Sequence, residues 1–316
     1  MKEFSVGGND AGQRVDKFVL KVTQGLPKSL LYKAIRTKMI KVNRKRCEAG
    51  QILAVGDSLQ LFLSPDFFGE AQYPWKKLTP SLSVVMEDEN LLICDKPAGL
   101  SCHSDETQKT GTLIDHIKAY LHKKGEFCPE RENSFAPALC NRIDRNTSGL
   151  VICAKNAAAL RELNEMIRTR RVEKRYLAWI HGEWTGPETV TVYLKKDPEK
   201  NKVFVSPTPR KEHLTAVTEV HPLFFDSARD RSLVQILLHT GRTHQIRATM
   251  AYFSHPLVGD SKYGLGRGDP DFAHQALRAH SLRFFPEKTS PLAYLEGRLI
   301  IAPENGLFSV PKSAPF

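Results

Sequence analysis

Four segments of the chain bring together residue types that can do chemistry on a substrate. At residues 95–100, 141–155, 173–182 and 240–264 they read DKPAGL, NRIDRNTSGLVICAK, EKRYLAWIHG and TGRTHQIRATMAYFSHPLVGDSKYG. Carboxylates can act as nucleophiles, guanidinium groups can keep a buried carboxylate ionised, and tyrosine rings can stack on a planar group. Taken one at a time, the segments also have structural interpretations as turns, surface ion pairs or packed aromatics.

The spacing of other residues excludes several chemistries. The six cysteines form no Cys-x-x-Cys pair and no regular Cys/His pattern, so neither a zinc site nor a disulfide framework is indicated, and we expect most of them to be reduced. The glycine-rich stretch GLGRGDP at residues 264–270 lacks the Gly-Lys-Ser/Thr ending of a phosphate-binding loop, which argues against nucleotide binding. No motif supplies the paired carboxylates of a glycosidase.

The histidines near these segments have a structural interpretation. Histidine is the commonest acid or base in enzymes, but His244 and Gln245 lie in a helical segment, where we expect them to buttress loops. His103 is interpreted in the same way. His255 precedes a proline and a Val-Gly-Asp sequence, which is typical of a turn.

The motifs become specific in combination. Residues 141–149 read Asn-Arg-Ile-Asp-Arg-Asn-Thr-Ser-Gly and residues 241–247 read Gly-Arg-Thr-His-Gln-Ile-Arg. With DKPAGL and the segment around Tyr176, they resemble the RluA family of pseudouridine synthases, of the RluC/RluD type with an N-terminal S4 module. The family has His-Arg-Leu-Asp-x-x-Thr-Ser-Gly and the same second motif. Asn141 replaces the family's usual His, and Arg278 stands where another His is common; neither position is the nucleophile, so these departures concern RNA contacts.

The resemblance implies an RNA pseudouridine synthase that needs no cofactor and no metal. It makes Asp144 the catalytic aspartate, Tyr176 the active-site tyrosine and Arg247 the basic partner of the aspartate. It also makes Arg142 a wedge that enters the space left by a flipped nucleotide, with an ordinary salt bridge as the alternative. Arg242, in the second motif, is expected to contact the RNA.

The reaction explains these residue types. Uridine isomerisation breaks the C1′–N1 bond, turns the uracil and joins its C5 to C1′, so a nucleophile must hold the ribose or the base during the turn. An ionised carboxylate can do this inside a pocket that excludes water, provided that a fixed guanidinium such as Arg247 stabilises its charge. Tyr176 can stack on the flipped base and lie near C5, where a proton finally leaves. Attack on the ribose and attack on the base both remain open.

The elements that must position these residues are short strands with helices between them. SVVMEDENLLICDKP, LVICAK, KRYLAWIHG, TAVTEV and SLVQILLH are β-rich. Asn156 is expected to cap one helix, and a second helix is expected after the cap residue Thr243. Since there is no βαβ alternation, we expect an α+β catalytic domain with a mixed, mainly antiparallel sheet over residues 83–316.

A small α/β unit is expected over residues 1–64, with a linker over residues 65–82. A helix is expected around Val15, Ser29 is expected to cap a second helix, and MIKVNRKR predicts a strand and a tight turn. RVDKFV, KSLLYKAIRTKMIKVNRK and GDSLQLFL resemble the S4 RNA-binding module. The resemblance implies that basic residues of this unit contact RNA phosphates, namely Lys33, Arg36, Lys41 and Arg44.

The charge of the chain agrees with an RNA partner. Its 316 residues include 46 Lys and Arg against 35 Asp and Glu, a net charge of +11 that favours a polyanion. There is neither a membrane-spanning apolar run nor a signal-like N-terminus, so we expect a cytoplasmic protein that does not bind membranes. We expect a monomer acting on large-subunit (23S) ribosomal RNA or ribosome-assembly intermediates. The alternatives are a tRNA substrate, or a noncatalytic RNA-binding or ribosome-assembly protein, against which the complete set of site residues argues.

Overall fold

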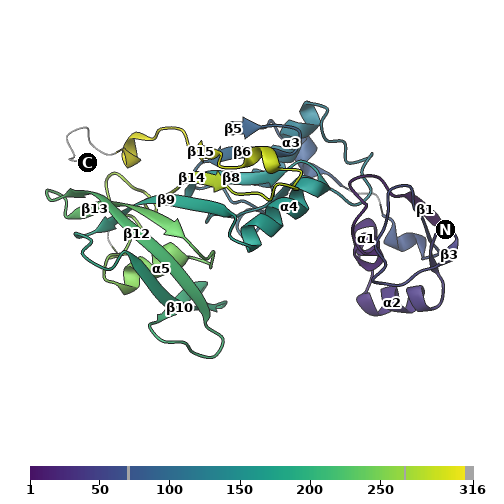
Figure 1. Cartoon of the computed structure of the whole chain (residues 1–316), viewed down its shortest axis with the longest axis horizontal. Coiled ribbons are helices and arrows are strands. Elements are labelled where there is room, and N and C mark those ends of the chain that lie inside the picture. The colour runs from purple at the N-terminus through teal and green to yellow at the C-terminus, as the bar shows by residue number, and fades with distance from the viewer. Residues whose placement is uncertain (70–71, 267, 310–316) are drawn as a thin grey trace.

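The computed structural model describes residues 1–69, 72–266 and 268–309, and it places them in two bodies (Figure 1). The smaller, N-terminal body has an antiparallel sheet in the order β1-β4-β2-β3 and two helices. Its elements are β1 (Lys2–Ser5), α1 (Val15–Val22), α2 (Lys28–Arg36), β2 (Ile40–Val42), β3 (Lys45–Arg46) and β4 (Ser58–Leu61). Helix α1 buries Phe18 and Val19, as their helical spacing predicts.

The second helix of the smaller body begins earlier than predicted. Pro27 is the N-cap of α2 and Ser29 lies inside its first turn, so the predicted Ser29 cap is wrong. The φ of Pro27, −63°, suits entry into a helix without any side-chain cap. The predicted tight turn after β2 is confirmed: Asn43 and Arg44 both have positive φ, as a two-residue hairpin turn requires.

The larger body is built on an eleven-stranded sheet. Its main path runs β11-β10-β12-β13-β9-β14-β8-β6-β5, with β15 paired to β14 and β7 paired to β8. Between the named strands of the described residues only the β8–β14 pair is parallel, which confirms the predicted mixed, mainly antiparallel α+β fold. The strands are β5 (Ser83–Glu87), β6 (Leu91–Lys96), β7 (Ala138–Leu139), β8 (Ser148–Ala154), β9 (Val172–His181), β10 (Thr189–Asp197), β11 (Lys202–Ser206), β12 (Leu214–Asp226), β13 (Arg231–Leu238), β14 (Leu277–Phe284) and β15 (Leu299–Ile301).

The alternation of side chains along the central strands divides the core between the two faces of the sheet. On β8, Val151 and Cys153 pack with α3 (Leu113–Lys123), while Leu150 and Ile152 pack with α4 (Ala157–Arg168). Helix α4 is capped by Asn156, whose side chain accepts a hydrogen bond from the N–H of Ala159, as predicted.

The fifth helix differs from its prediction at its start. Helix α5 (Gln245–Tyr252) has His244 rather than Thr243 as its N-cap, so the predicted cap is off by one residue. His244 has a left-handed backbone with φ of 50° and makes no side-chain cap. Its ring is thereby left available for other contacts.

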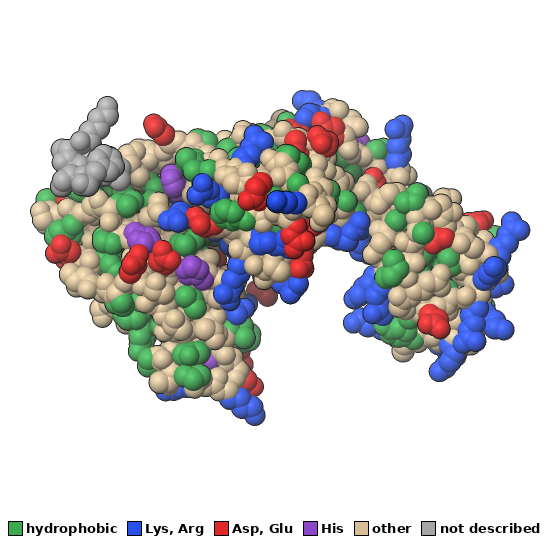
Figure 2. All heavy atoms as spheres, viewed as in Figure 1, with side chains coloured by type: hydrophobic (Ala, Val, Ile, Leu, Met, Phe, Trp, Pro, Cys, Tyr) green, Lys and Arg blue, Asp and Glu red, His purple; other side chains and the backbone are tan. Residues whose placement is uncertain are grey.

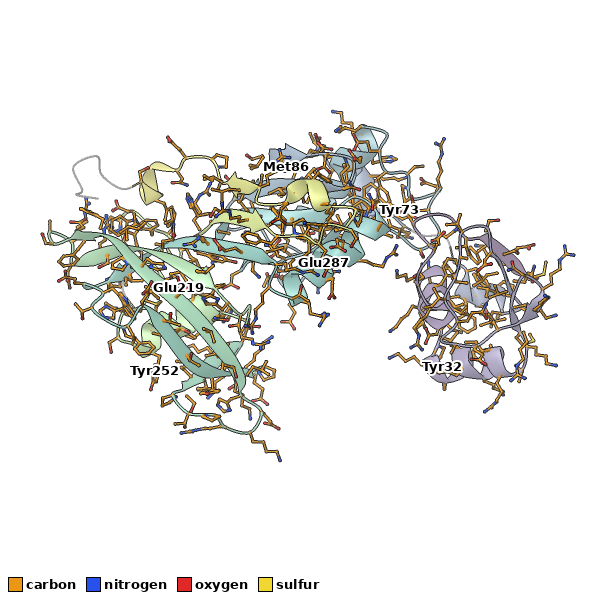
Figure 3. All side chains as sticks on the ribbon, in the orientation of Figure 1. Tyr32, Tyr73, Met86, Glu219, Tyr252 and Glu287 are labelled. Carbon is orange, nitrogen blue, oxygen red and sulfur yellow. The ribbon has the colours of Figure 1, made fainter. Side chains whose placement is uncertain are left out.

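The segment between the bodies contains two short 3-10 helices, η1 (Pro65–Phe67) and η2 (Pro74–Lys77). Trp75 is buried in the core of the larger body and stacks on Phe127, with the two ring centroids 5.7 Å apart. Tyr73 lies beside the junction of the bodies (Figure 3). The boundaries at residues 64 and 83 stay a prediction. In the described part of the chain no helix is long and apolar enough to cross a membrane.

Candidate active site

Three of the four motif segments, 141–155, 173–182 and 240–264, meet in one cleft of about 970 Å³ in the larger body, and the residues that directly follow DKPAGL complete its lining. The cleft is lined from the loop before β8, from β9, from the loop between β13 and α5, and from the loop after β6. The site residues among its lining are Arg142, Asp144, Tyr176, Arg242, His244 and Arg247. The structure thus brings together all of the site residues predicted in the larger body.

Arg247 joins two carboxylates. Its Nη1 donates to Oδ2 of Asp144 at 2.8 Å, while its Nε and Nη2 donate to the two oxygens of Asp260 at 2.7 and 2.9 Å. Arg247 is 6% exposed and Asp260 is 3% exposed, whereas Asp144 is partly open to the cleft. Asp260 therefore fixes the guanidinium in place, and the guanidinium presents its remaining nitrogen to the carboxylate of Asp144.

The ionisation of this pair favours a permanent positive charge beside Asp144. Burial acts to lower the pKa of Arg247, but hydrogen bonds and charges of Asp260 and Asp144 outweigh it and raise that pKa. Burial acts to raise the pKa of Asp260, and the guanidinium, with the backbone N–H groups of Tyr263 and Lys262, lowers it instead. Asp260 is thus an ionised counter-charge rather than a proton donor.

Lys96 holds the loop that carries Asp144. Its ammonium is fully buried and donates to three backbone carbonyls, those of Pro97 at 2.9 Å, Leu100 at 2.7 Å and Arg145 at 2.8 Å. Burial lowers the pKa of Lys96 to about 8. Because Arg145 follows Asp144 directly, Lys96 connects the DKPAGL turn to the loop that carries Asp144.

Tyr176 lies on β9 with its ring buried in the core that faces the cleft. Burial, together with the negative charge of Asp144, raises the pKa of Tyr176. Its phenol is therefore protonated at neutral pH, which suits stacking and hydrogen-bond donation better than proton abstraction.

The two arginines predicted to contact RNA lie at the surface of the cleft. Arg142 is exposed and makes neither an ion pair nor a hydrogen bond with any described residue, so the salt-bridge alternative finds no partner there. Arg242 is also exposed, and its Nε donates to the carbonyl of Thr215 at 3.1 Å. The rest of its guanidinium faces solvent.

The basic residues predicted in the smaller body lie away from the cleft. They are exposed or half-exposed on α2, β2 and the turn after β2: Lys33, Arg36, Lys41 and Arg44. Figure 2 shows Lys and Arg side chains around this body and on the side of the larger body that faces it. Any RNA that contacts both groups must therefore extend across the two bodies.

The two departures from the family motif have structural partners. Asn141 binds β8, accepting from the N–H of Ile152 at 2.8 Å. Arg278 is buried and donates to Asp95 at 2.8 Å and to the carbonyl of Pro303 at 2.9 Å. Asn141 thus supports β8, and Arg278 links β14 to β6 through Asp95.

Two residues of the site are not predicted from the sequence, Asp260 and Lys96. His244, for which the sequence predicts a structural role, lies with its ring 3.9 Å from Asp144. Asp260 had a detectable signal, since it lies in the same motif as Arg247, thirteen residues further on. For Lys96 the sequence offers only one indication of a role in the site, namely a charged residue at the end of an apolar strand.

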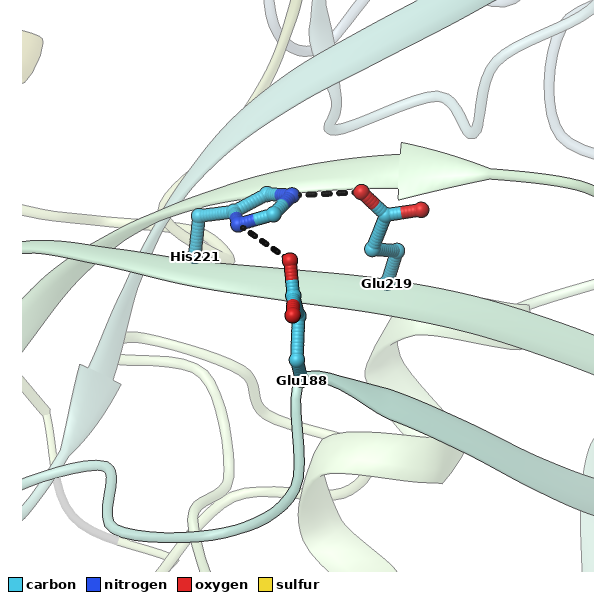
Figure 4. A group of neighbouring side chains, drawn as sticks. All are labelled: Glu188, Glu219 and His221. Atoms are coloured by element: carbon cyan, nitrogen blue, oxygen red, sulfur yellow. Dashed lines mark hydrogen bonds and ion pairs between the residues drawn. The ribbon is translucent and has the colours of Figure 1, made fainter.

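Outside the cleft, one group of side chains has metal-ligand chemistry. Among the described residues Glu188, Glu219 and His221 place one ligand atom each within 4.8 Å of the others (Figure 4). The atoms are already paired: His221 contacts Glu219 at 2.6 Å and Glu188 at 3.3 Å. Glu219 and His221 alternate with Val220, which packs in the same core as Tyr176, so they point to the other face of the sheet.

Comparisons with known proteins agree with this geometry. The model of the RNA pseudouridylate synthase family matches residues 90–252, which is just over half of the chain and includes Asp144, Tyr176 and Arg247. The chain belongs to this family. The predictions of an RNA pseudouridine synthase and of its enzyme class are therefore confirmed.

Other family members resemble the chain over most of its length. An uncharacterised RNA pseudouridine synthase of Mycoplasma genitalium is 31% identical over 299 residues, covering 93% of this chain and 92% of the relative. The ribosomal large subunit pseudouridine synthase C of Buchnera aphidicola is 32% identical, covering 91% and 92%. The solved structure of human RNA pseudouridylate synthase domain containing 4 has a TM-score of 0.54 at 20% identity, covers 72% of this chain and 90% of its own, and supports the fold.

Proposed function

We propose that this pseudouridine synthase isomerises uridines in large-subunit ribosomal RNA. The observation that carries the catalytic proposal is the carboxylate of Asp144 in the cleft, bonded to an arginine that the buried Asp260 fixes in place. The substrate class rests on relatives named ribosomal large subunit pseudouridine synthase C, which are 29 to 33% identical to this chain. In keeping with that substrate, we propose a cytoplasmic monomer.

In this proposal Asp144 is the nucleophile. Its oxygen forms a bond to the ribose or to the base, and the C1′–N1 bond breaks with its electron pair on the uracil. The uracil turns, C5 bonds to C1′, and the bond to Asp144 breaks with its electron pair returning to the carboxylate. Arg247 holds the carboxylate in place and supplies the positive charge beside it. Tyr176 stacks on the flipped base from the floor of the cleft, and the proton of C5 leaves to solvent or to a neighbouring group once the new bond has formed.

Arg142 is proposed as the wedge that replaces the extruded uridine in its stack. It lies at the mouth of the cleft, two residues before the nucleophile, without an ion-pair partner among the described residues. A planar, unpaired guanidinium can stack between bases and bond their edges. It therefore lowers the cost of extrusion, which is a few kcal/mol.

The smaller body is proposed to be an S4-like module that grips RNA away from the reacting uridine. Its exposed cations would neutralise phosphates without reading sequence: Lys33, Arg36, Lys41 and Arg44. Such contacts orient a large substrate while the cleft selects one nucleotide. The substrate would then be a folded RNA long enough to reach both bodies.

Mapping pseudouridines in cellular RNA, with and without this protein, tests the function. We expect one or a few sites in large-subunit ribosomal RNA to lose pseudouridine when the protein is absent and to regain it on complementation. Loss confined to tRNA would replace the proposed substrate. No loss in either RNA would refute the proposal.

Asp144→Asn should abolish isomerisation and leave RNA affinity nearly unchanged, because an amide is not a nucleophile and binding rests on dispersed cations. Purified variant and wild type are compared in single turnover on the mapped RNA and by equilibrium binding. Glu188→Gln is the matched control, because it removes one negative charge from the opposite face of the sheet and should react normally. A near-normal rate for Asp144→Asn would remove Asp144 from its role.

A further inference from the structure

His244 has a backbone conformation that few non-glycine residues adopt. It is the N-cap of α5, with φ of 50° and ψ of 22°, and its side chain is 10% exposed. Left-handed backbone costs a non-glycine residue of order 1 kcal/mol or more, and such positions cluster at functional sites. The conformation aims the imidazole into the cleft instead of along the helix.

A chain of hydrogen bonds fixes the orientation of this ring. The N–H of Val203 on β11 donates to the hydroxyl oxygen of Tyr263 at 2.7 Å, and that hydroxyl lies 2.9 Å from Nδ1 of His244. The hydroxyl hydrogen of Tyr263 is then free to donate to Nδ1, which leaves the ring proton on Nε2. Burial lowers the pKa of His244, so the ring is neutral at neutral pH.

The second ring nitrogen faces the nucleophile. Nε2 of His244 lies 3.9 Å from Oδ2 of Asp144, beyond hydrogen-bond distance, and it makes no hydrogen bond with another described residue. The negative carboxylate also favours the tautomer with a proton on Nε2. The cleft therefore presents an unused N–H donor and a carboxylate acceptor side by side.

A hydroxyl group matches this pair, because it can accept from Nε2–H and donate to the carboxylate at the same time. A uracil carbonyl can only accept, and a phosphate would be repelled by Asp144. When a nucleophile approaches the anomeric carbon region of a nucleoside, the nearest hydroxyl is the one on C2′. The ribose 2′-hydroxyl distinguishes RNA from DNA at a single nucleotide.

We propose that Nε2–H of His244 binds the 2′-hydroxyl of the target uridine and so selects a ribonucleotide at the reacting position. This inference rests on the proposed role of Asp144 as the nucleophile. Tyr263 acts through His244 as a positioning residue, and the hairpin between β10 and β11 holds Tyr263. Sugar selection in the cleft is thereby connected to a second part of the sheet.

The test compares two synthetic stem-loop RNAs that differ only at the mapped site, one with uridine and one with 2′-deoxyuridine. Affinities are measured on the Asp144→Asn background, where neither RNA should react. We expect this protein to prefer uridine, and His244→Ala to remove about 3- to 10-fold of that preference, the effect of one hydrogen bond. His244→Gln, which offers an amide N–H in place of the imidazole, should restore part of it.

His103→Ala is the matched control, because it removes another imidazole from the same cleft lining and should change both affinities by the same factor. An equal loss for the two RNAs in His244→Ala would overturn the inference and leave His244 a structural residue. Turnover of the uridine RNA by the Asp144→Asn background would instead refute the role of Asp144. The two failures are therefore distinguishable.

Discussion

Arg247 binds its two carboxylate partners in different ways. It binds Asp260 through two parallel hydrogen bonds and Asp144 through one, from a position that is almost fully buried. The fork geometry of a guanidinium permits this division, whereas a lysine ammonium is a single point of charge. The identity of the residue, and not only its charge, is therefore required.

Arg247→Lys should lose both stability and rate. The ammonium keeps the charge but cannot bond Asp260 and Asp144 together, so we expect about 1.5 to 3 kcal/mol less stability in urea unfolding. The single-turnover rate at saturating RNA should fall while RNA affinity stays nearly constant, since Arg247 is buried and its guanidinium is already bound to two carboxylates. Arg242→Lys, an exposed arginine of the same cleft, is the control and should unfold like wild type. A normal rate in Arg247→Lys would show that activity does not require one side chain that binds Asp260 and Asp144 together.

Lys96 should set a basic limit on activity. Its three carbonyl bonds use all three hydrogens of the ammonium, and its pKa is lowered to about 8. Below that pH the group is protonated and all three bonds are present; as the pH rises through about 8 the proton and one bond are lost. We therefore expect the single-turnover rate to fall above pH 8 as the Asp144 loop loosens.

Lys96→Met distinguishes deprotonation of Lys96 from titration of the RNA as the cause of the fall in rate above pH 8. The variant has no amine to titrate, so its rate should be low at every pH and show no decline near pH 8. A decline that persists in Lys96→Met would assign the basic limit to the RNA or to another residue. Lys118→Met, which removes a lysine from α3, should keep the wild-type profile.

At the scale of elements, the parallel contact between β8 and β14 fixes the loop that carries Asp144. Gly149 pairs with Ala279 and has φ of +112°. A Cβ at this position would lie 2.2 Å from the carbonyl oxygen of Ala279. This close approach explains why glycine follows Thr-Ser five residues after Asp144: a side chain would separate the strand that carries the loop from its neighbour.

Gly149→Ala should destabilise the larger body by about 2 to 4 kcal/mol, because two backbone segments must separate and the φ is unfavourable for alanine. Urea unfolding monitored by tryptophan fluorescence measures the change. Gly306→Ala is the control: its added Cβ meets nothing within 4 Å. Equal stabilities of the two variants would show that β8 and β14 can move apart freely.

Local patterns predicted the elements better than their ends. Asn156 was correctly predicted as a cap, because its side chain bonds a backbone N–H three residues away. The caps predicted at Ser29 and Thr243 were wrong. Pro27 is the N-cap of the first of these helices, and His244, with its left-handed backbone, is the N-cap of the other. Conformations of this kind depend on tertiary contacts that no sequence window contains.

The same contrast holds for the site: the sequence motifs predicted some of its residues, but not the tertiary partners of those residues. The motifs predicted that Asp144, Tyr176 and Arg247 would meet, although Asp144 and Arg247 are 103 residues apart. The partners of Lys96 include a backbone carbonyl 49 residues away, which no residue type can indicate. The carbonyls that Lys96 binds, and Asp260 as the second carboxylate of Arg247, are therefore identified only from the folded structure.

At the scale of the molecule, the two bodies meet through polar contacts. Within the described residues no hydrophobic cluster contains side chains from both bodies; the cluster of the smaller one ends at Phe68. Hydrogen bonds cross the junction from Asn9 to Glu132, from Gln13 to Ser134 and from Arg161 to the carbonyl of Ala11. Interfaces held in this way permit motion between domains.

Asp10 is the centre of this junction. It is 2% exposed, and its carboxylate accepts from Nδ2 of Asn133 at 2.7 Å and from the hydroxyl of Ser134 at 2.6 Å. The backbone N–H groups of Ser134 and Gly7 also donate to it. Three of these hydrogen bonds, from Asn133 and Ser134, cross the junction, so Asp10 helps to fix the angle between the two bodies.

Asp10→Ala should loosen this angle without altering the cleft. Its loss leaves four donors without their acceptor, so we expect a larger radius of gyration by small-angle X-ray scattering and an unchanged rate on a short stem-loop. Affinity for a long ribosomal RNA fragment should fall about tenfold, because two gripping surfaces without a fixed spacing have a lower effective concentration. The slope of affinity against salt should stay constant, since the same cations still reach phosphates.

Glu48→Ala, an exposed acid of the smaller body away from the junction, is the control. A flatter salt slope in Asp10→Ala would mean lost phosphate contacts instead of lost alignment, and an unchanged affinity would show that the RNA itself aligns the two bodies.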